Sequence, residues 1–253
     1  MVVMRAEPVS RVTPKPKSPP RFWFKLMQKP LHWVQAQIKG IRLLYEDSAV
    51  LAVYKPSGVL VHQTQGLKEP TLAGWVKKQT AQVASYPLYR LDRGTSGIVL
   101  FAKRKAFAQQ LNEAPMQKIY MLAVRGRTPL SGVIEHPLLN RSETQKVPAQ
   151  TRYRRVSDFQ IGTQVFSWVL AWPKTGRVHQ IRRHFKHISH PLVGDVKYGK
   201  GPINQLFRGQ TGLNRLMLHA RTLNFRHPET QKQIMLRANW DAEEQQALTR
   251  LAQ

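Results

Sequence analysis

The order of the short apolar segments constrains the fold of this chain more than any other feature. Runs rich in β-branched and aromatic residues between turn signals indicate strands, and apolar residues at helical spacing indicate helices. We expect strands at 41–45, 49–54, 98–103, 118–125, 151–156, 165–172, 216–225 and 234–236, helices at 71–82, 104–112, 178–188 and from 241, and a glycine-rich loop at 196–215. Strands outnumber helices without regular alternation, which predicts an α+β fold with a mixed, largely antiparallel central sheet flanked by helices and loops.

The chain divides by composition near residue 40. Residues 1–40 carry eight Lys and Arg against the single Glu7, with prolines at 8, 14, 16, 19, 20 and 30, which predicts an extended basic arm. Its aromatic residues Phe22, Trp23, Phe24 and Trp33 either stack on bases or pack on the body of the protein, and a mitochondrial presequence is a further alternative. Residues 41–253 are expected to form one domain with a sizeable core.

The charge of the chain indicates a polyanionic partner. Forty Lys and Arg against 14 Asp and Glu give a net charge of +26, which is typical of nucleic-acid-binding proteins. The longest apolar run, residues 165–172, is too short to cross a bilayer, and no signal-peptide pattern opens the chain. We therefore expect a nucleic-acid-binding protein outside the membrane, with a basic membrane-surface protein as the weakest alternative.

The absence of cysteine excludes several kinds of chemistry. Without Cys the chain has no disulfide, no thiolate zinc site and no thiolate nucleophile. This rules out a zinc deaminase with paired metal-binding cysteines and a uridine methyltransferase that attacks the base with a Cys. A reducing compartment, and hence a cytoplasmic location, fits this composition.

The acidic and histidine residues do not predict a metal site. The 14 acids are scattered, so a two-metal site is not expected. His179, His184, His187 and His190 are interspersed with Arg182, Arg183 and Lys186, whose charges would repel a divalent cation. We interpret this segment as a basic helix that faces phosphates.

Two segments resemble phosphate-binding or hydrolase motifs but depart from them. Residues 194–201 lack the Ser or Thr that holds magnesium in a phosphate-binding loop, because Gly201 stands at that position. Residues 94–97 are one residue short of a hydrolase nucleophile elbow. Both segments are interpreted as turns.

Asp92 is the acid with the most unusual surroundings. It stands between Arg90 and Arg93 before Gly94, and an apolar run begins at Ile98. An Asp in such a turn usually forms a structural ion pair, but a neighbouring guanidinium also keeps a nucleophilic carboxylate ionised. Both interpretations remain open from the residues alone.

Five ordered blocks give this chain a resemblance to a known family. The segment Arg90-Leu91-Asp92-Arg93-Gly94-Thr95-Ser96-Gly97 resembles the signature of the RluA-type pseudouridine synthases. Four further blocks agree with that family in order: 55–58 with Val61 and His62, 118–120 with Gly126, 175–182 with 190–195, and 218–220. Together the blocks cover about residues 41 to 230.

Within this family the chain particularly resembles the TruC type, which modifies tRNA at uridine 65. The residues that carry this resemblance are 182–184, 187, 190–191, 194–195, 198–199, 204, 212–213 and 215–220. Two positions depart from the family pattern: Tyr54 replaces the usual Asn before Lys-Pro, and Tyr89 replaces the usual His before Arg-Leu-Asp.

The resemblance implies a reaction and roles for individual residues. A uridine is flipped out, its base is detached from the ribose and rotated, and it is reattached through carbon 5, without a cofactor. Asp92 would be the nucleophile or base that acts at the ribose, Tyr120 would stack on the base, and Arg90 would fill the gap in the RNA stack.

The remaining implied roles concern contacts around these groups. Arg182, or less favourably Arg177, would pair with Asp92, while Leu218 would pack under the base or belong to the core. Lys174, Arg183 and Lys186 are expected to contact the RNA backbone. We expect a monomer that acts on tRNA. The alternatives are a ribosomal RNA pseudouridine synthase and a non-catalytic RNA-binding or ribosome-assembly protein in which Asp92 is a structural ion pair.

Overall fold

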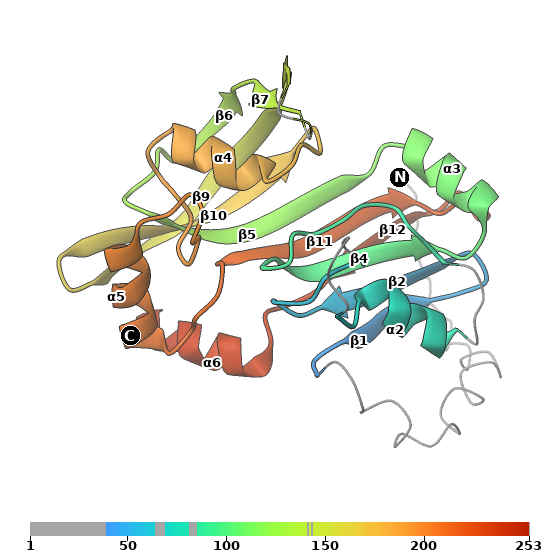
Figure 1. The fold of residues 1–253 in the computed structure, drawn as a ribbon, viewed down its shortest axis with the longest axis horizontal. Helices are drawn as coiled ribbons and strands as arrows, with labels where there is room; N and C mark the ends of the chain where they lie inside the picture. The colour runs from blue at the N-terminus through green and yellow to red at the C-terminus, as the bar shows by residue number, and fades with distance from the viewer. Residues whose placement is uncertain (1–38, 64–68, 81–84, 141, 143, 253) are drawn as a thin grey trace, which may run out of the picture. The chain divides into compact units, whose positions relative to one another are not determined.

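The computed structural model describes residues 39–253 except 64–68, 81–84, 141, 143 and 253 (Figure 1). The expected basic arm therefore lies almost entirely outside the described residues. The strands are β1 Arg42–Glu46, β2 Val50–Lys55, β3 Tyr86–Pro87, β4 Ser96–Ala102, β5 Gln117–Arg125, β6 Ser131–Glu135, β7 Leu138–Leu139, β8 Lys146–Val147, β9 Gln150–Ile161, β10 Gln164–Pro173, β11 Leu218–Arg226 and β12 Gln233–Arg237. The helices are α2 Leu72–Gln79, α3 Lys105–Glu113, α4 Gln180–His187, α5 Gly201–Thr211, α6 Ala242–Thr249 and a terminal 3₁₀ helix, Arg250–Ala252.

Ten strands form one mixed sheet. The order is β1-β2-β4-β11-β5-β10-β9-β6, with β12 paired to β11 and β3 paired to β4. Among the described strands, only β4 and β11 form a parallel ladder. The prediction of an α+β fold with a mixed, largely antiparallel sheet is confirmed.

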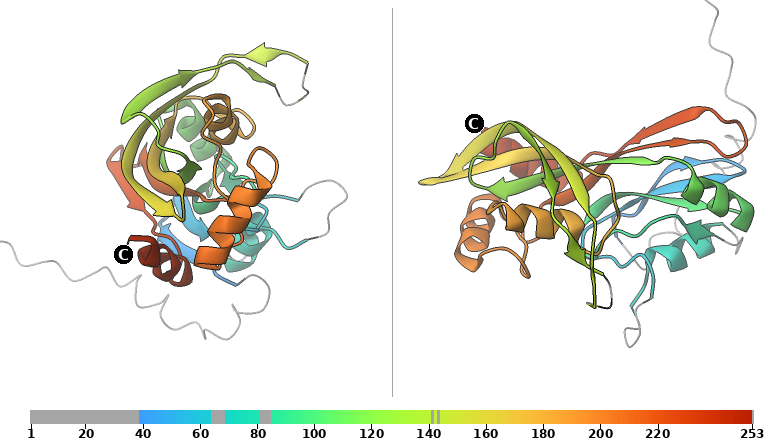
Figure 2. Two further views of the ribbon diagram at one scale, coloured as in Figure 1. Left: turned by 90° about the vertical axis from the view of Figure 1, so that its left-hand side faces the viewer. Right: turned by 90° about the horizontal axis from the view of Figure 1, so that it is seen from above.

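The centre of one half of the sheet is buried on both faces. Every residue of β2 and β4 is buried, which explains why these strands are continuous apolar runs in the sequence rather than alternating ones. Alternate residues serve opposite faces: Val53 and Val99 pack with α2, whereas Ala52 and Leu100 pack with α3. The two helices therefore pack on opposite faces of these strands. Figure 2 shows the same ribbon from two further sides.

The face covered by α2 extends across the sheet to α4. Its core cluster contains Leu72 of α2 and Phe185 of α4. The buried side chains of Leu91, Tyr120 and Leu218 belong to the same cluster. A third cluster, which includes Phe159, Phe166 and Phe207, packs α5 and the C-terminal helices against β9 and β10. The segment with Asp92 thus lies at the face that α2 and α4 share.

Helix α5 corrects the expectation of a glycine-rich loop at 196–215. Pro202 stands in its first turn, Gly212 ends it in the left-handed conformation at φ 74°, and Phe207 buries its inner face. The prediction was wrong because the glycines at 199, 201, 209 and 212 were interpreted as one loop. Helix α2 also ends at Gln79, before the expected residue 82, and the short strands β3, β6, β7 and β8 were not predicted.

None of the described helices has the length and apolar content needed to span a membrane.

Candidate active site

Asp92 lies in the loop between β3 and β4. The loop is fixed on one side by the buried side chain of Leu91 and on the other by a turn in which the Thr95 amide donates to the Asp92 carbonyl oxygen over 3.0 Å. The Asp92 side chain is 28% exposed, so its carboxylate reaches a surface that a substrate can contact. The chain therefore presents one partly exposed acid at the start of a buried strand.

Gly97 allows β4, which follows the Asp92 loop, to approach β11 closely. Its φ is +116°, and a Cβ at this position would lie 2.3 Å from the carbonyl oxygen of Ala220. Gly97 is the register partner of Ala220 on β11, and Ala220 is the register partner of Tyr120 on β5. The close strand approach that only glycine allows thus brings the Asp92 loop within two strands of Tyr120.

Lys55 and Ser57 hold the same loop from β2. The buried Lys55 Nζ donates to the carbonyl oxygens of Pro56, Val59 and Arg93 at 3.0, 2.8 and 3.1 Å. Ser57 Oγ donates to the Gly94 carbonyl oxygen at 2.8 Å. Burial lowers the pKa of Lys55 to about 7, with Arg215 acting in the same direction and Asp92 in the opposite one.

The Gly58 amide adds a backbone contact to this arrangement, since it donates to the Arg93 carbonyl oxygen at 2.8 Å. The segment 55–58 is therefore a clamp on residues 93 and 94, next to Asp92. Its side chains act on Asp92 through the backbone that carries it.

Arg182 supplies the cation that faces Asp92. It extends from α4, and its Nη1 donates to Asp92 Oδ2 at 3.2 Å. Its other nitrogens are held by Asp195, with Nε to Oδ2 at 2.7 Å and Nη2 to Oδ1 at 2.9 Å. Burial alone would lower the pKa of Arg182, but the hydrogen bonds from Arg182 to Asp195 raise it above its usual value. Arg182 therefore remains a fixed cation.

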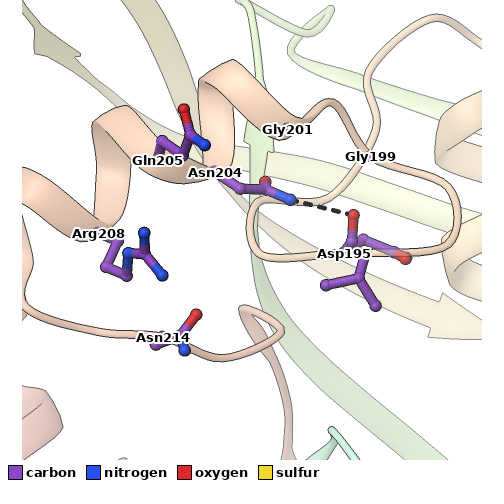
Figure 3. A pocket seen from close by; sticks show the side chains of 8 residues that line it. Asp195, Gly199, Gly201, Asn204, Gln205, Arg208 and Asn214 are labelled. Carbon is purple, nitrogen blue, oxygen red and sulfur yellow. Dashed lines mark hydrogen bonds between the residues drawn. The ribbon is translucent and has the colours of Figure 1, made fainter.

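Asp195 is itself held by its own loop. Its Oδ1 accepts from the backbone amides of Lys197 and Tyr198, both at 2.9 Å. Burial would raise the pKa of Asp195, but the hydrogen bonds from Arg182 and these amides keep it below its usual value. The loop is tied to α5, because Asn204 Nδ2 donates to the Asp195 carbonyl oxygen at 3.1 Å (Figure 3).

Figure 3 also shows the cavity outside this loop, whose volume is about 270 Å³. Its labelled lining residues are Asp195, Gly199, Gly201, Asn204, Gln205, Arg208 and Asn214.

His179 is a residue near Asp92 to which the sequence had assigned no role. It precedes α4 in the left-handed conformation, with φ 52° and ψ 29°, a conformation that is costly for a side chain other than glycine and concentrates at functional sites. Its Nε2 lies 3.8 Å from Asp92 Oδ2, and its Nδ1 is hydrogen-bonded to the Tyr198 hydroxyl at 3.1 Å. Burial lowers the pKa of His179, although Asp92 acts to raise it.

Tyr120 and Leu218 form the apolar part of the site. Both are buried, at 8% and 4% exposure, in the same cluster as Leu91. Burial raises the pKa of Tyr120, and the negative charge of Asp92 raises it further. Tyr120 is therefore a neutral phenol, and it lies close enough to Asp92 for the carboxylate charge to affect its pKa.

The two departures from the family pattern are both accommodated inside the protein. Tyr89 donates from its hydroxyl to the Ile98 carbonyl oxygen at 2.9 Å, and Lys118 Nζ lies 4.7 Å from the centre of its ring. Tyr54 is fully buried, with the guanidinium of Arg42 4.1 Å from its ring centre. Tyr89 packs against the cluster that contains Tyr120 and also against the cluster on the opposite face of the sheet, to which Tyr54 belongs.

The fold brings together four of the residues named from the sequence: Asp92, Tyr120, Arg182 and Leu218. Arg177 instead donates from Nε to the Pro148 carbonyl oxygen at 3.2 Å.

The other basic residues named from the sequence either contact other parts of the protein or are exposed. Arg183 donates to the carbonyl oxygens of Leu139 and Val178 at 3.0 and 3.4 Å. The side chains of Arg90, Lys174 and Lys186 are exposed. Arg93 contacts the Gly58 carbonyl oxygen at 3.0 Å and pairs with Glu69 at 3.0 Å.

Three residues that build the site had no role in the sequence-based assignment: Lys55, His179 and Asp195. Each of these three residues lies in a block that carries the family resemblance, and this position was the signal that could have found it. The role of each residue depends on a contact with a residue of another segment of the chain, which the sequence does not show. Within the described residues no cluster of His, Asp and Glu has the arrangement of a metal site. The chemical groups present are a partly exposed carboxylate held by a guanidinium, a neutral phenol and an apolar wall.

Comparisons with known proteins agree with this arrangement. The model of the family described as RNA pseudouridylate synthase matches residues 49–187. The chain is 37% identical over 220 residues to the tRNA pseudouridine synthase C of Haemophilus ducreyi, covering 79% of this chain and 90% of that one. It is 34% identical over 214 residues to the ribosomal large subunit pseudouridine synthase C of Buchnera aphidicola, covering 79% of this chain and 67% of that one.

The fold recurs in a solved human structure. Human RNA Pseudouridylate Synthase Domain Containing 4 aligns with a TM-score of 0.68 over 83% of this chain and 92% of that chain, at 22% identity.

Proposed function

This chain belongs to the RNA pseudouridylate synthase family and is therefore an isomerase that acts on RNA, and we propose that its substrate is tRNA and its nucleophile Asp92. The observation that supports the role of Asp92 is its contact with Arg182 at 3.2 Å, beside the buried ring of Tyr120. A carboxylate that reacts near phosphates must remain ionised, and a guanidinium at this distance favours the ionised form. We assign the activity to residues 41–253.

The proposed reaction exchanges one bond of the nucleotide for another. The bond between uracil N1 and ribose C1′ breaks, and a bond between uracil C5 and C1′ forms. The hydrogen at C5 leaves as a proton and N1 gains a proton, so the isomerisation needs no oxidant or reductant. Asp92 reacts with the ribose while the base is detached.

The surrounding residues position the flipped nucleotide. Tyr120 stacks on the base, and Leu218 supplies apolar surface below it. Arg182 orients Asp92, and the clamp formed by residues 55–58 fixes the loop that carries it. Arg90 is exposed beside Leu91 and fills the place that the uridine leaves in the RNA stack.

The choice of tRNA rests on the relative from Haemophilus ducreyi, which is named a tRNA pseudouridine synthase. The resemblance to the TruC type makes uridine 65 the proposed target. Ribosomal RNA is the second candidate, because the relative from Buchnera aphidicola is named a ribosomal large subunit synthase. We also propose that the protein acts as a monomer, and an enzyme that acts on tRNA is expected in the cytoplasm.

Tritium release tests the reaction and the substrate together. Transcripts of tRNA and of ribosomal RNA carrying tritium at uracil C5 are incubated with the full chain, since the new bond must displace that hydrogen. We expect release from tRNA, none from tRNA with cytidine at position 65, and none with Asp92→Asn. Release from ribosomal RNA alone would transfer the substrate assignment to that RNA. Release that persists in Asp92→Asn would contradict the role of Asp92, and binding without any release would favour the non-catalytic RNA-binding alternative.

A further inference from the structure

A second concave site lies beside the candidate active site. It has a volume of about 310 Å³, and we call it the histidine pocket. Its lining residues are His136, Leu138, Arg183, Lys186, His187 and Tyr198. Among the described residues, the lining thus combines two imidazoles, two cations and one phenol, and none of these lining residues carries a carboxylate.

The two imidazoles of the pocket are stacked on one another. The ring centres of His136 and His187 are 3.7 Å apart, with 15° between the ring planes. His136 lies between β6 and β7, and His187 is the last residue of α4. The position of His136 is fixed by the buried His184, whose Nε2 lies 3.1 Å from the His136 carbonyl oxygen. The stacked pair is therefore a built feature of two elements that are far apart in the sequence.

The groups that face this pair are mostly positive. Burial lowers the pKa of His136, and His187, Lys146 and Arg183 lower it further. The carboxylate of the adjacent Glu135 accepts a hydrogen bond from Gln150 Nε2, and it does not line the pocket. Arg183 and Lys186 line the pocket beside the stacked rings, and their unmatched charge favours an anion.

The histidine pocket adjoins Asp92 through Tyr198. The Tyr198 hydroxyl is hydrogen-bonded to His179 Nδ1 at 3.1 Å, and His179 Nε2 lies 3.8 Å from Asp92 Oδ2. The guanidinium of Arg182, which contacts Asp92, lies 5.1 Å from the centre of the Tyr198 ring. An RNA strand whose target nucleotide occupies the site at Asp92 therefore passes close to the histidine pocket.

We infer that the histidine pocket binds a phosphate of the RNA strand next to the nucleotide at Asp92, and that the stacked pair of His136 and His187 takes up a proton when this phosphate enters. The inference rests on the proposed function, because it assumes that RNA occupies the site at Asp92. A phosphate among the cations offsets their mutual repulsion and favours the imidazolium form. The proton comes from solvent, and Arg183 and Lys186 provide the charge that does not depend on pH.

The direction of the pH effect follows from linkage. In this proposal the histidine pair binds more protons with RNA bound than without it. The affinity for RNA therefore rises as the pH falls from the pKa of the pair in the complex towards the pKa of the pair in the free protein. Uptake of one proton allows at most about a tenfold rise in affinity for each pH unit. Without proton uptake, these imidazoles would contribute nothing to the pH dependence of the affinity.

The experiment measures the dissociation constant of a tRNA transcript at fixed salt from pH 8 to pH 5.5. The full chain with Asp92→Asn is used so that the RNA is not modified. His136→Gln and His187→Gln are added to this background, singly and together. Lys105→Gln is the matched control, because it removes an exposed charge on α3, which packs on β3 and β4 rather than on β9 and β10. The free energy of unfolding by urea verifies that each variant folds.

We expect affinity to rise as pH falls in the background and in Lys105→Gln, and to change by less than about twofold in the double histidine variant. Calorimetry in buffers of different ionisation enthalpy should show proton uptake that the double variant loses. An unchanged pH dependence in that variant, or no binding of the transcript at pH 6, would overturn the inference. Tritium release by the chain with native Asp92 is measured separately, so proton-linked binding without release would count against the proposed function alone.

Discussion

Arg182 and Asp195 form a buried ion pair with two hydrogen bonds, Nε to Oδ2 at 2.7 Å and Nη2 to Oδ1 at 2.9 Å. The pair leaves Arg182 Nη1 directed at Asp92, 3.2 Å away. The position of the guanidinium is thus determined by an acid other than the proposed nucleophile. Asp92 can therefore engage a substrate without releasing Arg182 from its place, because the Asp195 side chain is fully buried and remains bonded.

Asp195→Asn should destabilise the protein and lower turnover. Removing one charge of a buried pair leaves the other without compensation, and we expect a loss of about 3 kcal/mol in the free energy of unfolding. Urea denaturation and tritium release measure the two effects. Glu69→Gln is the matched control, because it neutralises an acid in the exposed pair with Arg93 and should cost no more than about 1 kcal/mol. Equal losses for both variants would contradict this account.

Lys55→Met should lower kcat more than Ser57→Ala. Lys55 donates to three carbonyl oxygens around the Asp92 loop, whereas Ser57 donates to one. We expect about a hundredfold loss of kcat for Lys55→Met, because small displacements of a reacting group are costly. Ser57→Ala should cost about 1 kcal/mol in stability. Multiple-turnover tritium release at saturating RNA gives kcat, and a native value for Lys55→Met would show that the clamp does not position Asp92.

Gly97→Ala should prevent folding, while Gly58→Ala should be tolerated. Both glycines have positive φ, +116° and +86°, but an added Cβ at residue 97 would lie 2.3 Å from the Ala220 carbonyl oxygen, and one at residue 58 would meet nothing within 4 Å. Backbone strain alone should cost about 1 kcal/mol at Gly58. Strain and displacement of β11 should cost about 4 kcal/mol or more at Gly97. Soluble yield and urea midpoints measure the difference in stability between the two variants. Equal stability of the two variants would show that β4 and β11 can move apart at little cost.

Stability should fall between pH 6.5 and pH 4. Burial lowers the pKa of His184 and of His219 from 6.5 to about 4, so both are neutral in the folded protein. In this interval the unfolded chain binds protons that the folded chain excludes. The contribution is therefore present above pH 6.5 and is lost as pH falls, with a slope of at most about 2.7 kcal/mol per pH unit for two protons. Urea unfolding across this range measures the slope, which His184→Gln should reduce.

Arg90→Ala should weaken the action on structured RNA without destabilising the fold. Arg90 is exposed, so the free energy of unfolding should change by less than about 0.5 kcal/mol. If Arg90 replaces the flipped uridine in the stack, turnover should fall more with folded tRNA than with an unstructured oligonucleotide, because only stacked bases must be separated. Lys232→Ala, an exposed charge between β11 and β12, is the control. Equal losses on both RNAs would indicate a phosphate contact instead.

Local patterns in the sequence predicted much of the fold. Apolar runs predicted β2, β4, β5 and β10, and helical spacing of apolar residues predicted α2, because burial is recorded in neighbouring residues. The turn at residues 174–177 predicted the start of α4, and the acids Glu243 and Glu244 predicted the first turn of α6. Helix α5 was not predicted, since its glycines are equally compatible with a loop. The burial of Phe207 against Phe159 and Phe166, which favours the helix, depends on strands about 40 residues away.

The sequence by itself determined the family, the α+β class, the excess of positive charge and the acid proposed to react. The tertiary structure decided which cation faces that acid: Arg182 lies 90 positions from Asp92, whereas Arg90 and Arg93 are its neighbours in the chain. It also placed Lys55 beneath the loop and His179 beside the carboxylate. The physical reason is that each of these contacts joins elements that are far apart in the sequence, and no local pattern encodes the distance between separate elements.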